Sequence, residues 1–225
     1  MTGRRRPALS RAAIVDRAIA LADAEGLATV TVRRLAREHG VSAMAFYAHF
    51  RDKDEILDAM AGRLLAQVAL PERPPGQWDE DLHAVLAAFV DGLRRHPAAA
   101  VLATRAMLDS DAGLRISERV LGLLAEAGYR ADAAASVCKY LVAALIALVT
   151  SEPGRGHGRG ATDPTDATDG QARRSRRARL AALPPERYPH VVAAADGLSH
   201  CADVDAHYSR GVRLLVGGLR ATAAD

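Results

Sequence analysis

Residues 31–50 read TVRRLAREHGVSAMAFYAHF, and this stretch decides the fold. Thr31 and Ser42 are residue types that cap helix N-termini, and Gly40 between them can adopt the positive φ of a tight turn. Apolar residues on both sides of the turn can pack the two short helices together: Leu35, Ala36, Val41 and Phe46. The stretch therefore predicts a helix-turn-helix whose second helix can lie in the major groove of DNA.

Helical patterns flank this motif on both sides. Ser10 caps a helix with apolar residues at the i, i+4, i+7 spacing, which we expect to end at Gly26 in the left-handed conformation. Asp52 caps a longer helix that is expected to continue to Pro71, and Glu55 completes a capping box there. Residues 1–70 are thus predicted to form a three-helix helix-turn-helix domain, whose three short helices are followed by this longer one.

The remaining residues, 71–225, are also helical in their patterning. Helices are expected at about 78–93, 98–108, 112–127, 131–150 and 204–221. Residues 151–170 hold five Gly, two Pro and no large apolar side chain, so we expect a mobile loop there. No convincing strand is found. The chain is predicted to be all-α, with the small N-terminal domain followed by a larger helical domain.

Composition places the chain among soluble globular proteins, with 49% hydrophobic and 25% charged residues in 225. Charge is uneven, because residues 1–53 hold ten basic and five acidic residues, whereas the rest holds twenty and twenty-two. No signal-peptide core is found, and the longest apolar run, 140–149, is shorter than the ~20 residues of a membrane span. We expect a cytoplasmic protein without membrane contact, in which this run forms a buried helix.

The run from Ser10 to Leu65 resembles the N-terminal domain of the TetR family of transcriptional regulators. The matching segments are residues 18–26, 31–36, 40–42, 46–50 and 53–57. The later chain resembles the tetracycline-repressor type of C-terminal domain at Trp78, at residues 183–185 and at residues 207–219. The resemblance implies a ligand-responsive DNA-binding regulator, a repressor that a small molecule releases from its operator.

Several polar residues around the motif can donate hydrogen bonds to phosphates. In the family, Tyr47, His49 and Lys53 match positions at the DNA backbone or adjoining bases, and Arg33 matches a position that can read guanine. The second helix of the motif, here called the reading helix, begins with small or apolar residues, so the operator sequence cannot be deduced from them. The predicted DNA-binding residues are Thr31, Arg33, Ser42, Ala43, Met44, Tyr47, His49 and Lys53.

The resemblance also implies that the C-terminal helices hold a small effector of unknown identity. Apolar walls with few polar anchors suggest these ligand-binding candidates: Leu86, Phe89, Leu102, Arg105, Met107, Leu123 and Tyr140. Arg105 would need an anionic or carbonyl partner, unless it lies on an exposed face. Val101 occupies the position of a metal-binding His in the tetracycline repressor, so we expect an effector other than tetracycline, with neither a metal nor a cofactor.

In this family the C-terminal helices also form a homodimer, which holds the two N-terminal DNA-binding domains about one DNA turn apart. Two helices are candidates for the interface. One carries Val137, Leu141, Ala144, Leu145 and Leu148, and the other carries Tyr208, Gly211, Val212, Leu215 and Leu219. Packing of both helices as plain protomer core is the alternative.

Other signals fit known sites less well. The spacing of His200, Cys201 and His207 matches no standard metal site, and the Gly repeat in residues 154–160 follows no strand. The Arg-rich residues 173–179 could touch nucleic acid, although a solvated edge is the simpler interpretation. A small-molecule-binding or enzymatic helical protein with an incidental helix-turn-helix remains the alternative function.

Overall fold

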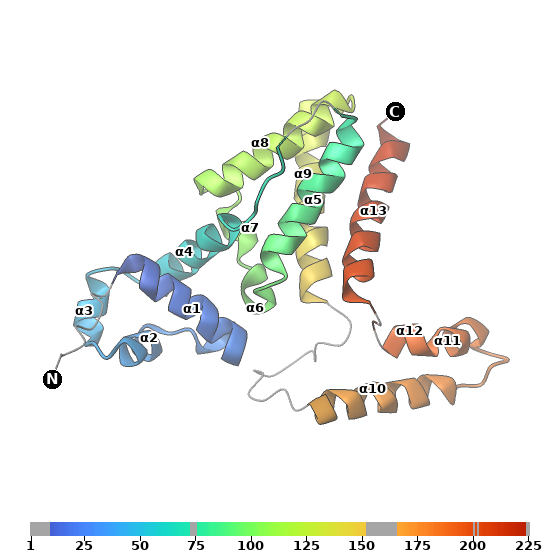
Figure 1. Ribbon diagram of the computed structural model, residues 1–225, viewed down its shortest axis with the longest axis horizontal. Helices are drawn as coiled ribbons and strands as arrows, with labels where there is room; N and C mark the ends of the chain where they lie inside the picture. Colours follow the sequence, from blue (N-terminus) through green and yellow to red (C-terminus); the bar gives the residue numbers. More distant parts are fainter. Residues whose placement is uncertain (1–9, 73–75, 152–165, 200, 202, 224–225) are drawn as a thin grey trace.

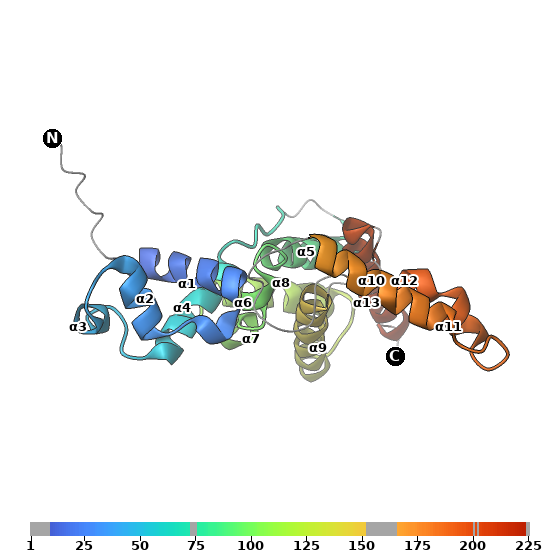
Figure 2. The same cartoon turned by 90° about the horizontal axis from the view of Figure 1, so that it is seen from below.

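The structure is a computed structural model that describes residues 10–72, 76–151, 166–199, 201 and 203–223. Throughout these residues the regular structure is helical, which confirms the all-α prediction (Figure 1). The chain forms an N-terminal head, then a central helical body and an arm, and it returns from the arm to the body in its last helix. The head lies at one end of the elongated molecule and the arm at the other (Figure 2).

The head contains α1 (Arg11–Glu25), a short 3₁₀ turn η1 (Leu27–Thr29), α2 (Val32–His39), α3 (Ala43–Tyr47) and α4 (Lys53–Leu65). Each of the predicted N-cap side chains accepts a hydrogen bond from a backbone N–H of its own helix: Ser10 from Ala13, Thr31 from Arg34, Ser42 from Ala45 and Asp52 from Glu55. These caps are local, so they were predictable from residue type and spacing.

Two expected helix ends in the head are wrong in detail. Gly26 has a positive φ of 88° but a ψ of 155°, so it is extended rather than left-handed helical. The chain passes from it directly into η1. The helix α4 ends at Leu65, well before Pro71. The backbone N–H groups of Gln67 and Val68 bond to the carbonyls three residues earlier, as in a 3₁₀ turn, instead of four residues earlier.

The body contains α5 (Trp78–Leu93), α6 (Pro97–Ala100), α7 (Ala103–Ala106), α8 (Asp111–Glu126), α9 (Ala131–Thr150) and α13 (Val204–Thr222). The single helix expected at 98–108 is wrong, because tight three-residue turns at Leu102 and Arg105 divide it into α6 and α7. The helices α5, α8, α9 and α13 lie side by side and share most of the apolar core of the body (Figure 1).

The helix α9 is buried on one side only, which corrects the expectation of a buried helix. Its mean hydropathy is 2.0, and 28% of its most apolar stretch of 18 residues is buried. Of the described helices it alone is long and apolar enough to cross a membrane. It packs against α5, α6, α8 and α13 in the body, and Tyr140 on its outer side is 75% exposed. Among the described residues, the outer side of α9 that carries Tyr140, Ala143 and Ala147 is therefore left uncovered in the protomer.

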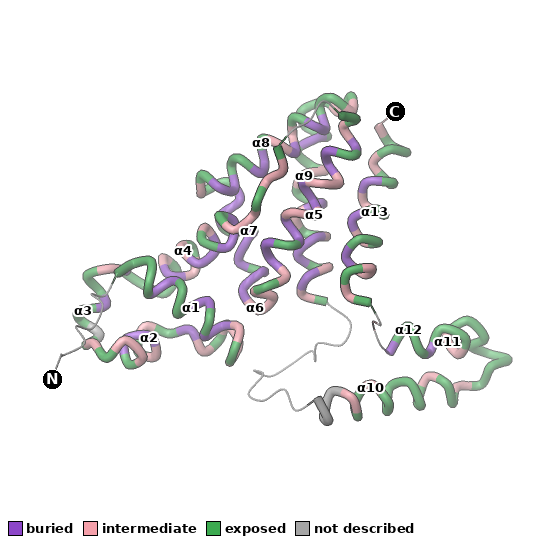
Figure 3. The backbone as a smooth tube through the Cα atoms, in the orientation of Figure 1, coloured by how far each residue is buried: buried purple, intermediate pink, exposed green. Residues whose placement is uncertain are grey.

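The arm contains α10 (Asp166–Ala181), α11 (Pro189–Ala193) and α12 (Ala195–Ser199), which pack mainly on one another. The Arg-rich residues 173–179 belong to α10, a helix that the sequence did not predict, and most of them are exposed (Figure 3). Residues 152–165 of the expected loop, with their Gly repeat, lie outside the described residues. Residues 166–170, also assigned to that loop, are helical.

Candidate DNA-binding face and ligand cavity

The helix-turn-helix forms as the sequence predicts. Gly40 ends α2 in the left-handed conformation (φ 66°, ψ 33°), and the N–H of Val41 reaches back to the carbonyl of Ala36 at 3.0 Å. This pair of features is the Schellman motif that ends many helices at glycine. Leu35, Ala36 and Phe46 are buried, and Val41 packs partly buried against them.

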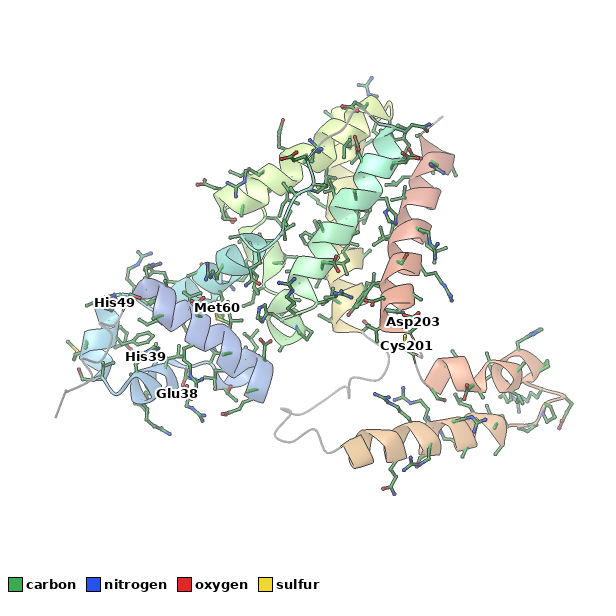
Figure 4. The ribbon with its side chains drawn as sticks, viewed as in Figure 1. Glu38, His39, His49, Met60, Cys201 and Asp203 are labelled. Atoms are coloured by element: carbon green, nitrogen blue, oxygen red, sulfur yellow. The ribbon has the colours of Figure 1, made fainter. Side chains whose placement is uncertain are left out.

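The predicted DNA-binding residues belong to the start of α2, to α3 and its ends, and to the first residue of α4. Met44 and Tyr47 are 79% and 49% exposed, and His49 is partly buried at the end of α3 (Figure 4). Four others are exposed around them: Thr31, Arg33, Ser42 and Lys53. The side chain of Ala43 lies outside the described part of the chain. Six of these residues are therefore exposed on the helix-turn-helix and the start of α4, although their role stays a prediction.

Some basic residues of the head are already engaged by carboxylates. Arg34 bonds to Glu38 at 2.8 Å and to Glu25 at 2.5 Å, and Arg17 also bonds to Glu38. Hydrogen bonds from Arg17 and then Arg34 lower the pKa of Glu38, and the bond to Glu38 raises the pKa of Arg34. In the described residues Arg33 has no such ion pair, so its guanidinium is available to DNA.

The turn between α3 and α4 departs from the predicted capping box. Asp52 caps α4 through the N–H of Glu55, as expected, at 2.8 Å. The Glu55 carboxylate, however, accepts from the N–H of Arg51 at 2.8 Å rather than from that of Asp52. The reciprocal half of the box is therefore displaced by one residue toward α3.

A cavity of about 300 Å³ opens between α7, α8 and α9. It is mainly apolar, and its lining residues are Thr104, Met107, Leu108, Ser117, Leu121, Ala135, Cys138, Lys139, Val142 and Ala143. Among its described lining residues, Lys139 alone is charged. The hydroxyl of Thr104 donates to the carbonyl of Val101 at 3.2 Å. Burial raises the pKa of Cys138, which keeps this thiol protonated at neutral pH.

A narrow extension of about 10 Å³ shares Met107, Cys138 and Val142 with this cavity and reaches α5. Leu86 and Phe89 line it. Met107, Leu86 and Phe89 are thus the ligand-binding candidates that the structure brings to a cavity. The extension is too small for more than a water-sized group, so the larger cavity is the candidate ligand site.

The other ligand-binding candidates lie elsewhere. Leu102 and Leu123 are buried but line neither cavity, and Tyr140 is on the outer side of α9. Arg105 does have an anionic partner, but that partner is protein: its Nε lies 2.7 Å from Asp58 Oδ1 of α4. Sequence spacing identified apolar helix faces but not which face meets which, so it missed the cavity residues of α8 and α9.

The helices expected to form the dimer are present, but most of the named residues face inward. Leu141, Leu145, Tyr208 and Val212 are buried in the protomer. Gly211 lies so close to Leu148 that an added Cβ would approach its Cδ2 to 2.7 Å. The outward faces of the two helices instead carry Tyr140, Ala143 and Ala147 on α9, and Leu214, Gly217, Gly218 and Ala221 on α13.

The polar clusters near the arm form no recognisable site. Arg177 pairs with Asp196 of α12 at 2.8 Å, so part of the Arg-rich surface stabilises the arm itself. Cys201 donates to the carbonyl of Asp203 at 3.3 Å (Figure 4), and His200 lies outside the described residues. Among the described residues, no three His, Cys, Asp or Glu side chains converge as a metal site would require.

Two family descriptions match this chain. Residues 14–60 match "Bacterial regulatory proteins, tetR family", and residues 70–223 match "Tetracyclin repressor-like, C-terminal domain". A relative from Saccharopolyspora erythraea described as an HTH-type transcriptional regulator is 32% identical over 224 residues, which is 98% of this chain and 88% of the relative.

Two further matches have a more specific description. The tetracycline repressor protein class C of Escherichia coli is 28% identical over 94% of this chain and 90% of its own length. The crystal structure of ActR from Streptomyces coelicolor in complex with actinorhodin superposes with a TM-score of 0.77 and 28% identity. That match covers 96% of this chain and 99% of ActR.

Proposed function

The chain belongs to the TetR family of bacterial regulatory proteins, and from this premise we propose that it binds its operator as a homodimer and leaves it when an apolar molecule fills the cavity between α7, α8 and α9. It is a ligand-responsive DNA-binding transcriptional regulator. One observation carries the proposal. Arg105 of α7 forms an ion pair with Asp58 of α4, the helix that begins at the DNA-binding candidate Lys53. The residue next to Arg105, Thr104, lines the cavity.

The DNA contacts divide by chemistry. The proposed phosphate contacts are Thr31, Ser42, Tyr47, His49 and Lys53, which can donate hydrogen bonds. Arg33 can offer two parallel donors to a guanine edge, and the lack of an ion pair between it and any described residue supports this role. Ala43 and Met44 would contact thymine methyl groups or exclude water at the start of the reading helix.

The effector is proposed to be mainly apolar, with an acidic or carbonyl group that can meet Lys139. The complex of ActR with actinorhodin supports a small-molecule site in this type of domain. Tetracycline bound through a metal is not proposed, because Val101 cannot coordinate one. Among the ligand-binding candidates of the sequence, Met107 is retained for the main cavity and Leu86 and Phe89 for its extension.

The homodimer is proposed to form through the outward faces of α9 and α13. Leu214 is 71% exposed and Tyr140 is also mostly exposed, while small residues beside them would let a second copy approach closely. Burying such a surface would remove the uncovered apolar face of α9 from water. Four helices, two from each copy, would then hold the two DNA-binding domains at the spacing of successive major grooves.

We place the domain boundary after residue 70, between α4 and α5. Residues 1–70 then form the DNA-binding domain, and residues 71–225 form the effector-binding and dimerisation domain. We propose a cytoplasmic location, where the operator is accessible, and no catalytic activity.

The experiment selects duplexes from a random-sequence pool with the full-length chain, then screens apolar compounds by thermal shift and tests each hit for release of the selected duplex. Ala135→Phe, which fills the cavity, is expected to abolish the thermal shift and the release while DNA binding persists. Ala193→Phe on the exposed surface of α11 is the matched control. Failure of the wild-type chain to enrich any duplex, or hits that act equally on Ala135→Phe, would contradict the proposal.

A further inference from the structure

Arg11, the first residue of α1, lies against the turn that joins α3 to α4. Its Nη1 donates to the carbonyl oxygen of His49 at 2.5 Å and to Glu55 Oε1 at 2.8 Å. Its guanidinium carbon lies 4.1 Å from the centre of the Phe50 ring. One side chain from a different helix thus touches the end of α3, the turn and the first turn of α4.

The end of α3 needs such a partner. The helix has five residues, and the N–H groups of His49 and Phe50 both reach back to the carbonyl of Phe46. The last carbonyls of a helix lack partners within it, and the helix dipole is negative at this end. A guanidinium at that end is favourable for both reasons, and Arg11 supplies it to the carbonyl of His49.

The second partner, Glu55, is held in its charged form. Its other oxygen, Oε2, accepts the N–H of Arg51 at 2.8 Å. This backbone bond and then the bond from Arg11 lower the pKa of Glu55 to about 2. At neutral pH the carboxylate therefore holds Arg11 on one side and the backbone of the turn on the other. Phe50, which is only 1% exposed, anchors the same turn in the core.

We infer that Arg11 is a positioning residue for DNA binding: it fixes the turn between α3 and α4 so that Tyr47, His49 and Lys53 are arranged for the DNA backbone before DNA arrives. This inference rests on the proposed function of these three residues. Nη1 of Arg11 donates to two protein oxygens of the turn and of α4, so we assign its effect to the turn rather than to a phosphate contact, which the salt dependence of the affinity distinguishes. Arranging the contacts in advance removes the entropy cost of ordering them on binding.

The test replaces Arg11 by Met in the full-length chain, which keeps an unbranched stem over Phe50 but removes the donors. Affinity for a duplex selected by the wild-type chain is expected to fall about tenfold at every salt concentration. The slope of log affinity against log salt is expected to stay unchanged. Arg11→Lys is expected to recover part of the loss, because an ammonium group can also reach both oxygens.

Arg63→Met is the matched control, because Arg63 also joins α4 to α1, through Asp16 at 2.9 Å, but away from α3. It is expected to leave affinity unchanged. Amide hydrogen exchange of the free protein gives a second readout. In Arg11→Met the amides of Phe50 and Arg51 are expected to exchange faster, with protection of α1 and α5 retained.

Three results would overturn the inference: unchanged affinity in Arg11→Met, a salt slope shallower by about one, which would mean that Arg11 itself binds a phosphate, or loss of amide protection throughout the head. If the wild-type chain selects no duplex, the proposed function fails instead. The exchange measurement still tests whether Arg11 holds the turn.

Discussion

Arg105 of α7 and Asp58 of α4 form an ion pair between the body and the head, with 2.7 Å between Nε and Oδ1. Nη2 of Arg105 also lies 3.2 Å from Asp54 Oδ1, one residue from Lys53. The bond to Asp58 raises the pKa of Arg105, so the guanidinium stays charged. Since Thr104 lines the cavity, a shift of α7 on ligand binding would be transmitted directly to α4.

Arg105→Gln is expected to weaken the communication between effector and operator while leaving each separate affinity nearly intact. The ratio of operator affinities without and with effector is expected to fall by roughly tenfold, within the usual range of allosteric coupling. Operator titrations by fluorescence anisotropy, with and without a saturating thermal-shift hit, measure this ratio.

The charge-reversed pair Arg105→Asp with Asp58→Arg is the control, since it restores opposite charges across the same gap. We expect the double variant to regain part of the coupling that either single variant loses. Equal coupling in wild type and Arg105→Gln would show that the ion pair plays no part in transmission.

Lys53→Ala is expected to weaken binding to all DNA sequences alike, because the side chain meets phosphate rather than a base edge. Loss of one phosphate contact is also expected to reduce the salt slope by about 0.9. Filter binding across a range of salt concentrations measures both effects. Lys139→Ala removes the same charge from the cavity and should leave the slope as it is.

Leu214→Glu is expected to dissociate the dimer, because it places a charge in the outward apolar face of α13. Sedimentation velocity is expected to show monomers. The affinity for the operator is expected to drop because the two DNA-binding domains are no longer joined. Leu198→Glu on α12, where the leucine is also exposed, is the matched control. A Leu214→Glu protein that remains dimeric would assign the interface to another surface.

Glu55 is expected to contribute stability that depends on pH. Its pKa is lowered to about 2 in the folded protein from an ordinary value of 4.5. The contribution is therefore fully present above about pH 4.5 and is lost as the pH falls toward 2. Between pH 5 and pH 2.5 the Tm of wild type is expected to fall further than that of Glu55→Gln. Glu118→Gln on α8 should follow wild type.

The DNA-binding head was predicted closely because its signals are local. A cap such as Ser42 or Asp52 needs only the residues one turn away, and Gly40 needs only its own backbone freedom. The arm was missed for the same reason: α10 is polar nearly all round, so its sequence has no apolar periodicity to identify it.

The cavity was predicted less well than the reading helix. An apolar face shows that a helix is packed, but the partner is chosen by residues far away in the chain. Arg105 illustrates this: its sequence context allowed an anionic or carbonyl partner or an exposed face, whereas the partner that the fold supplies, Asp58, lies 47 residues earlier. Likewise, four of the apolar residues named for the dimer are buried within the protomer, where Leu141 and Leu145 face α5 and α8.

The sequence by itself determined the helical class, the helix-turn-helix, its caps and the family, because these depend on residue type at short spacing. Only the tertiary structure decided which faces of α7, α8 and α9 enclose a cavity, which face of α9 stays open, and that Arg11 and Arg105 each bind a distant helix. Those relationships arise from the packing of side chains brought together by folding, which periodicity along one helix does not specify.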